Sequence, residues 1–283
     1  MTIRSHHTSR IAAPAGVLLI AASFLLSSCS TNSVGLDAAD IDIEPYANVT
    51  ATLDFEAGTA ILPVDAIDRD ATQVDELRRE AWRVLTDACL AESGLPGYSW
   101  SETVPSEEDR LFGLWSVPLA QEYGFEMAAT IDQVTPPTPN EDELRCLDES
   151  KEEMRTRFNL DDGYSFDAQV ARAAYDAAFT SAEGTAALAA AKECMVEQGL
   201  EFGADSPMPQ FDYEAAGDSA ENRRIAVIEA TCNVETGAIQ TLYDLTARYQ
   251  SALIDANEAD AKDAAEIVAT RIADFEGVIS ASK

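Results

Sequence analysis

The chain has 283 residues, and its 51 acidic and 19 basic side chains give it a formal net charge of −32. This charge excludes a general nucleic-acid-binding surface, because phosphates need a basic face, and we expect no nucleic-acid partner. It also excludes electrostatic docking on anionic lipid. The length suffices for one large hydrophobic core or two modest ones.

The first 28 residues have the layout of an export signal. Arg4 and Arg10 carry positive charge, and the 16-residue apolar stretch 11–26 that follows is short for a membrane-spanning helix, which needs roughly 20 residues. It ends in Leu26-Ser27-Ser28-Cys29, which resembles the bacterial lipobox. The resemblance implies cleavage before Cys29 and attachment of fatty acyl chains, such as palmitate, to this cysteine. We therefore expect a lipoprotein anchored in the cell membrane, on its extracytoplasmic face.

Cleavage of the signal peptide would leave a mature chain without histidine. Residues 1–28 contain both histidines, two of the 19 basic residues and none of the 51 acidic ones, so the mature chain has a formal charge of −34. A chain without histidine cannot use Ser-His-Asp or Cys-His catalysis or the usual histidine-containing zinc sites. We expect no metal and no cofactor.

Two segments precede the helical part of the chain. Residues 29–50 are rich in small, polar and acidic side chains, and this composition predicts a flexible tether. Leu53 and Phe55 then alternate with polar residues, Gly58 can turn the chain, and Ile61 resumes an apolar run. This pattern predicts a short β-hairpin closed by Pro63.

Helical patterns dominate from residue 72 onward. Thr72-Gln73-Val74-Asp75 resembles a capping box, and its helix is expected to end near Gly94. Further helices are expected from Ser106, from Asn140 to about Phe158, over 165–179 and 183–198, and in a long stretch from Ala220 to Ser280 that Gly237 kinks or breaks. The predicted fold class is mainly α: a helical domain with a short N-terminal β-hairpin, two disulfide-stapled modules and a long C-terminal helix.

Four cysteines follow Cys29, and an even number in an exported protein predicts two disulfides, for which three pairings are open. Residues 87–95 align with residues 192–200 without gaps. Each segment carries a cysteine near a helix end and a glycine five residues later. Each is followed by one further cysteine, which favours Cys89–Cys146 and Cys194–Cys232. The predicted modules are 51–160 and 161–283, with one disulfide in each.

Three short segments of the first half carry a family resemblance. They are Ile61-Leu62-Pro63-Val64-Asp65, Cys89-Leu90-Ala91-Glu92-Ser93-Gly94 and Ala120-Gln121-Glu122-Tyr123-Gly124-Phe125. Their order over about residues 58–127 resembles uncharacterised secreted proteins and lipoproteins of actinobacteria. A fourth segment, Asp109-Arg110-Leu111-Phe112-Gly113-Leu114, has Leu111 and Phe112 where the family usually has Arg-Tyr around a turn, and Val64 replaces the usual Leu. The resemblance implies an extracytoplasmic, cysteine-bridged module and no particular activity.

Acidic side chains are candidates for chemistry, because a glycoside hydrolase needs only a pair of carboxylates. The acidic runs contain Glu107, Glu108, Asp109, Glu141, Asp142, Glu143, Asp148 and Glu149. Charge runs on helices are usually solvated faces, however, and among 51 acids some pair lies close by chance. No catalytic residue is assigned.

Two tryptophans are candidates for ligand contact. Trp100 and Trp115 flank an expected loop, where exposed indoles stack on sugars or hold a peptide. Packing in a small core is the favoured interpretation.

The leading hypothesis is a non-enzymatic binding or assembly module of the cell envelope. It would be held at the membrane by its lipid anchor and would face an unknown envelope protein or glycan. The alternatives are a carboxylate-dependent hydrolase of cell-wall glycan and a solute-binding accessory of a transporter.

Overall fold

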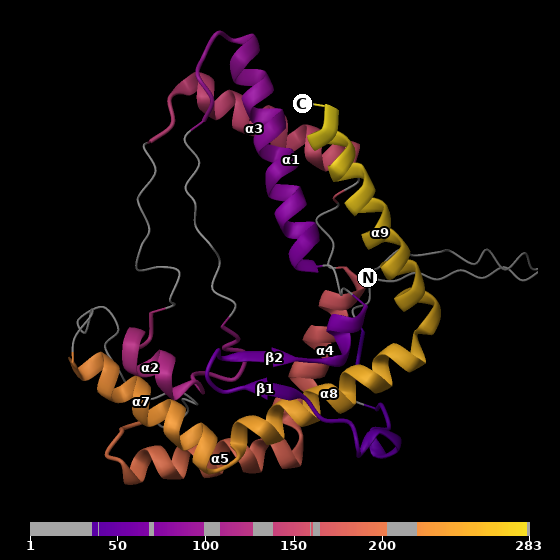
Figure 1. Ribbon diagram of the computed structural model, residues 1–283. Helices are drawn as coiled ribbons and strands as arrows, with labels where there is room; N and C mark the ends of the chain where they lie inside the picture. The colour runs from indigo at the N-terminus through magenta and orange to yellow at the C-terminus, as the bar shows by residue number, and fades with distance from the viewer. Residues whose placement is uncertain are drawn as a thin grey trace, which may run out of the picture. The chain divides into compact units, whose positions relative to one another are not determined.

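The computed structural model describes residues 36–38, 40–67, 71–98, 108–126, 138–158, 160, 165–202 and 220–281. These residues form one two-stranded hairpin, two short 3-10 helices and eight α-helices (Figure 1). The prediction of a mainly helical fold with an N-terminal hairpin, two disulfides and a long C-terminal helix is confirmed. Within the described ranges, no helix combines the length and the apolar character needed to cross a membrane.

The segment before the hairpin packs against the helices from Leu36 onward. Ala38 is buried against Val170 and Leu253, and the 3-10 helix η1 (Glu44–Tyr46) follows. The Tyr46 hydroxyl donates a hydrogen bond of 2.7 Å to Asp255. In its described part, the segment expected to be a flexible tether up to residue 50 therefore packs on the helices. The reason is that apolar residues spaced among the acids, such as Leu36, Ile41, Ile43 and Val49, provide the packing contacts.

The predicted hairpin consists of β1 (Thr52–Asp54) and β2 (Thr59–Ile61), which pair antiparallel with Thr52 opposite Ile61. Gly58 closes the turn with a positive φ of 69°, a conformation that glycine adopts without strain. The ladder ends at Ile61, and Pro63 opens the 3-10 helix η2 (Pro63–Ala66). Proline suits the first helical position because its missing N–H would have no helical partner there.

One group of helices consists of α1 (Ala71–Glu92), α3 (Glu141–Arg157) and α9 (Glu258–Ala281). Phe158 and Phe275 meet edge to face in their shared core, with ring centroids 4.9 Å apart. Asn140 caps α3 as predicted, because its side chain accepts the backbone N–H groups of Asp142 and Glu143.

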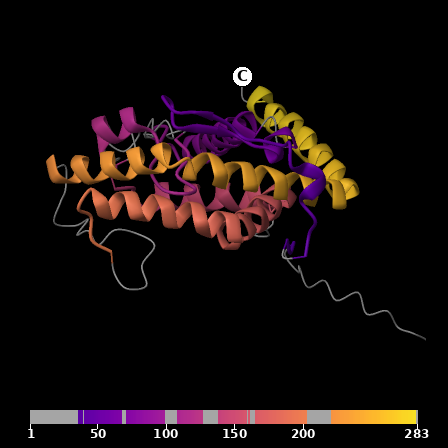
Figure 2. The ribbon, with the colours of Figure 1, turned by 90° about the horizontal axis from the view of Figure 1, so that it is seen from below.

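The other helices pack around α8 (Ala238–Ala256), which contacts α4 (Phe166–Thr180) and α5 (Ala182–Glu197). Figure 2 shows α7 (Ala220–Glu235) and α8 lying alongside α5 and α4. The short helix α2 (Val117–Tyr123) packs on α7. Helices from the two halves of the chain therefore interleave, since α2 contacts α7 and α9 contacts α1.

The helical stretch expected from Ala220 to Ser280 is three helices. Gly237, with φ of 68°, separates α7 from α8, and Asn257 separates α8 from α9. The predicted break at Gly237 is confirmed, whereas the break at Asn257 was not predicted. Asn257 tolerates a helix end because its side-chain amide donates to the carbonyl of Leu253.

The helix expected to open at Ser106 differs from the structure. Residues 108–116 form turns and coil, and α2 begins only at Val117 with Ser116 as its cap. The acids that suggested a helix start make other contacts. Glu108 pairs with Arg110 at 2.8 Å, and Asp109 accepts the Leu111 N–H at 2.8 Å.

Candidate functional site

Both disulfides form in the pairing that the repeated helix end favoured. Cys89 is bonded to Cys146 and Cys194 to Cys232, with Cα atoms 5.6 Å apart in each pair. The two copies of the motif also share their backbone geometry. Gly94 and Gly199 have positive φ, and the next residue in each copy donates its N–H to a carbonyl five residues earlier. The resemblance between the two segments is therefore structural as well as sequential.

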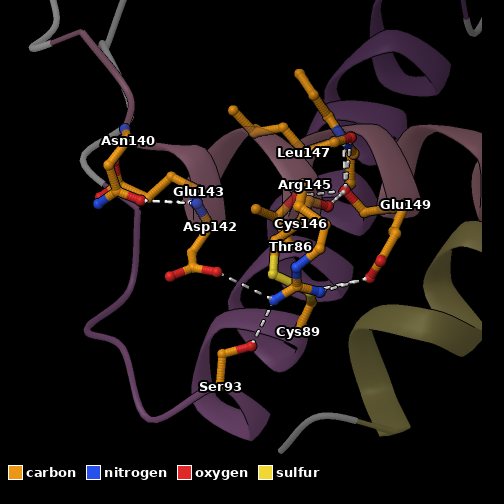
Figure 3. The surroundings of a disulfide bond; sticks show 12 residues. Thr86, Cys89, Ser93, Asn140, Asp142, Glu143, Arg145, Cys146, Leu147 and Glu149 are labelled. Atoms are coloured by element: carbon orange, nitrogen blue, oxygen red, sulfur yellow. Dashed lines mark hydrogen bonds and ion pairs between the residues drawn. A yellow bond between two sulfur atoms is a disulfide. The ribbon is translucent and has the colours of Figure 1, made fainter.

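Figure 3 shows Arg145 of α3 lying over the Cys89–Cys146 disulfide. Its guanidinium donates to the Ser93 hydroxyl at 2.8 Å and to Glu149 at 3.0 Å, and lies 3.9 Å from Asp142. Cys146 itself is fully buried. These contacts close the end of α1 onto α3, and they engage two of the acids that were candidates for chemistry.

Of the two tryptophans that were candidates for ligand contact, the structure describes Trp115 and does not describe Trp100. Trp115 is 1% exposed, and its indole N–H donates to the carbonyl of Asp109 at 2.6 Å. It packs edge to face against Phe55 and Tyr243. Trp115 thus belongs to the core and offers no surface for a ligand, which corrects the ligand-contact interpretation. Trp100 and the predicted lipidation site Cys29 lie outside the described residues.

Most acids of the candidate runs have structural partners. Asp109 accepts the hydroxyl of Tyr243 at 2.5 Å, and burial, followed by the nearby Asp109 charge, raises the pKa of this phenol. Glu143 accepts the backbone N–H of Asn140 in the capping box of α3. Glu141 and Asp148 are exposed on α3, and Glu107 lies outside the described residues.

A pocket of about 480 Å³, which the sequence did not predict, lies among α4, α5, α7 and the loop before α2. Most of its wall is aromatic or apolar: Phe112, Tyr175, Phe179, Leu188, Met195 and Phe202. Four polar side chains also line it: Arg110, Lys192, Glu229 and Asn233. A mostly apolar cavity of this size with a few polar groups has the character of a small-molecule site.

Two residues one turn apart on α7 hold the loop that borders the pocket. Glu229 Oε1 accepts the N–H of Leu114 at 2.9 Å, and Asn233 donates to the Leu114 carbonyl at 2.8 Å. The close approach of this loop to α7 requires glycine at position 113, where φ is 92°. A Cβ added there would lie 2.6 Å from Glu229 Oε1. The backbone can therefore come close enough to bind both side chains.

Two residues that line the pocket, Glu229 and Arg110, each carry a buried polar atom without a hydrogen-bond partner among the described residues. Glu229 is 3% exposed, and burial raises its pKa, although the Leu114 N–H and the charge of Arg110 act in the opposite direction. In the part of the chain that the structure describes, Glu229 Oε2 and Arg110 Nε are buried and have no hydrogen-bond partner. Such atoms are uncommon in folded proteins, because each unmet bond costs about 1–3 kcal/mol.

The Cys194–Cys232 disulfide joins two walls of this pocket. Cys194 precedes Met195 on α5, and Cys232 precedes Asn233 on α7, and both of these neighbours line the cavity. The bond therefore fixes the separation of α5 and α7 beside the polar groups.

Sequence reasoning missed Glu229 because it lies among ordinary helical residues. One signal was present: Glu229 falls four residues after Ile225 and three after Ala226, on the buried face of α7. An acid on the apolar face of a helix needs a tertiary partner or a function.

Comparisons with known proteins do not identify this site. No protein-family model, no curated protein and no solved structure matches the chain. Across the described ranges, no group of three or more His, Cys, Asp or Glu side chains is placed to hold a metal ion.

Proposed function

We propose that this protein is an extracytoplasmic lipoprotein that binds a small, largely apolar ligand in the pocket among α4, α5 and α7. The observation that carries the proposal is the pocket itself, in which mostly aromatic and apolar walls surround four polar side chains. Its volume of about 480 Å³ falls within the range of about 300–1,000 Å³ that is usual for ligand sites.

The proposed location rests on two features. The two disulfides indicate an oxidising, extracytoplasmic compartment. The lipobox ending in Cys29 favours attachment to the cell membrane through acyl chains.

A binding function fits the pocket better than glycan hydrolysis. Glycoside hydrolases place two carboxylates on either side of the scissile bond. Glu229 is the one carboxylate among the described residues that line this pocket, and its Oε1 is already bonded to the Leu114 backbone. Among the described residues, the pocket therefore lacks the second acid that this reaction needs.

The first prediction is that the mature protein binds the neutral fluorescent probe N-phenyl-1-naphthylamine at one site. Ala189, on the exposed side of α5, lines the pocket, so Ala189→Trp should obstruct it without disturbing the core. We expect probe affinity to fall at least ~10-fold in Ala189→Trp, since a loss of about 1.4 kcal/mol corresponds to tenfold. Fluorescence titration measures the affinity.

Ala190→Trp is the matched control, because Ala190 is also exposed on α5 but does not line the pocket. It should bind the probe as tightly as the wild type. Equal weakening in both variants, or binding that Ala189→Trp leaves intact, would refute the proposed site.

A further inference from the structure

The charged side chains around the pocket differ in balance from the rest of the chain. Of the described residues that line it, three are charged: Arg110, Lys192 and Glu229. Two of the three are cations, in a chain whose acidic residues outnumber its basic residues by 51 to 19. A cavity with this balance favours a negatively charged group, whereas the chain as a whole repels one.

Two of these three side chains are engaged within the protein. Arg110 is paired with Glu108 at 2.8 Å, and its Nε is buried. Glu229 Oε1 accepts the Leu114 N–H, and its Oε2 is buried. The pair with Glu108 compensates the charge of Arg110, and burial raises the pKa of Glu229, which disfavours its charged form. Lys192 is therefore the charged residue of the pocket that acts most directly on a ligand.

Lys192 holds its ammonium group against the aromatic wall of the pocket. Its Nζ lies 4.8 Å from the centre of the Phe202 ring, and both residues line the cavity. The Lys192 side chain is half-buried, so water screens its charge less than the charge of an exposed lysine. An ammonium group has three N–H donors, so it can bind a ligand in addition to its contacts within the chain. It offers a carboxylate both an opposite charge and a hydrogen bond.

The walls indicate the remainder of the ligand. The ring centroids of Phe112 and Tyr175 are 5.2 Å apart, and those of Tyr175 and Phe179 are 5.7 Å apart. These three side chains line the same cavity as Lys192. An aromatic or branched apolar group packs well against such a surface. One cation beside an apolar wall suits a ligand with a single negative charge, because a second charge would be buried without a partner.

We propose that the pocket binds a small monocarboxylate whose apolar body packs on the aromatic wall and whose carboxylate pairs with Lys192. A cationic ligand would meet the like charge of Lys192, and a neutral head group would form no ion pair with it. This inference rests on the proposed binding function of the same pocket.

The test compares three probes that share one body and differ in their head groups. They are 3-phenylpropanoate, the neutral 3-phenylpropanamide and the ammonium ion of 3-phenylpropylamine. Each is measured at pH 7 by displacement of N-phenyl-1-naphthylamine, in about 0.15 M salt, which largely screens exposed charges more than about 8 Å away. We expect the carboxylate to bind at least ~10-fold more tightly than the amide, and the ammonium ion to bind most weakly.

Lys192→Met removes the charge and keeps an unbranched side chain of similar length. The ratio of carboxylate affinity to amide affinity should fall to about 1 in this variant, and Lys192→Arg should keep a ratio of at least ~10 because it keeps the charge. A ratio measured within one variant does not depend on how far the substitution weakens binding in general. If Lys192→Met does not fold, the wild-type probe series alone decides.

Lys151→Met is the matched control. Lys151 is exposed on α3 and does not line the pocket, so this variant should keep the wild-type ratio of carboxylate to amide affinity. An equal fall of the ratio in Lys151→Met and Lys192→Met would show that the preference comes from the overall charge of the protein, and it would overturn the inference.

The remaining outcomes separate the two proposals. Suppose that N-phenyl-1-naphthylamine binds in the pocket. If the carboxylate then binds no more tightly than the amide, or keeps its preference in Lys192→Met, or displaces no fluorescent probe, the carboxylate inference is overturned and the binding function stands. If the fluorescent probe does not bind, and calorimetry detects no binding of the other three, the binding function itself fails.

Discussion

Glu229 combines a structural bond with an unmet one on the same carboxyl group. One oxygen ties α7 to the loop at Leu114, and the other is buried without a partner among the described residues. A buried carboxylate with an unmet bond is destabilising, and such groups are found more often at functional sites than elsewhere. The close approach of Gly113 to this carboxyl requires glycine, because an added Cβ would lie 2.6 Å from Glu229 Oε1.

The second prediction concerns stability as a function of pH in the variant Glu229→Gln. Burial raises the pKa of Glu229 above its ordinary value of 4.5, so the folded state binds this proton more readily than the unfolded chain. Its contribution to stability is fully present below pH 4.5 and is lost as pH rises through the raised pKa. Glutamine does not titrate. We therefore expect the variant to gain stability relative to the wild type as pH rises from 4.5, and the gain to level off once pH exceeds the raised pKa of Glu229.

Urea unfolding between pH 4 and pH 8 measures this difference. Glu193→Gln on α5 serves as a control, since Glu193 is exposed and should show no comparable trend. A difference between Glu229→Gln and wild type that stays constant with pH would contradict the assignment.

At the residue level, the sequence was informative where spacing alone decides the outcome. The cysteine pairing followed from two similar helix ends, and the helix expected to begin at Asn140 does so with Asn140 as its cap. Glu229 and Arg110 could not be paired in this way, because 119 residues separate them and only tertiary packing brings them to one pocket.

The two disulfides occupy different positions among the helices. Cys89–Cys146 joins α1 to α3, and neither cysteine nor its chain neighbours line the pocket. Cys194–Cys232 joins two walls of the pocket. By the loop-entropy account both bonds stabilise the fold by similar amounts, about 4 kcal/mol each, because they close loops of 57 and 38 residues. Only the second bond is expected to affect the pocket directly.

The third prediction compares the two double variants, Cys194→Ser/Cys232→Ser and Cys89→Ser/Cys146→Ser. Both should lower the free energy of unfolding by about 2–5 kcal/mol. Affinity for N-phenyl-1-naphthylamine should fall only in the Cys194/Cys232 variant, because α5 and α7 are then free to separate. Denaturant unfolding and fluorescence titration, at a temperature where both variants are folded, provide the two readouts. Equal loss of affinity in both variants would show that the effect is global.

Element boundaries were predicted best where a residue has one clear conformational role. Gly237 was expected to interrupt the C-terminal helices and does so with a left-handed backbone. Asn257 gave no such signal. The helix expected from Ser106 failed because Glu108 pairs with the nearby Arg110, and Asp109 accepts the hydroxyl of Tyr243 from α8 instead of capping a helix start. The local sequence pattern cannot distinguish an acid that caps a helix from an acid that contacts other side chains.

At the scale of the whole chain, packing does not follow chain order. α9 packs on α1 and α3, and α2 packs on α7, so the described elements of both halves share their cores. The N-terminal segment takes part as well, since the Ala51 N–H donates to Asp244 of α8 and the Val64 N–H donates to Gln250. The packed part of the described chain therefore begins by Leu36, about fifteen residues before the end that composition gave to the expected tether.

The fourth prediction concerns the anchor that this N-terminus is proposed to carry. Cleavage before Cys29 would leave a chain with a formal charge of −34, which anionic lipid repels, so acyl chains would have to supply the attachment. Cys29→Ala should abolish labelling by radioactive palmitate in bacterial cells and move the protein from the membrane fraction to the soluble fraction. Ser28→Ala keeps a small residue at that position of the lipobox and should remain labelled. Labelling that persists in Cys29→Ala would refute the anchor. Loss of labelling with unchanged membrane association would instead reveal a protein partner at the membrane.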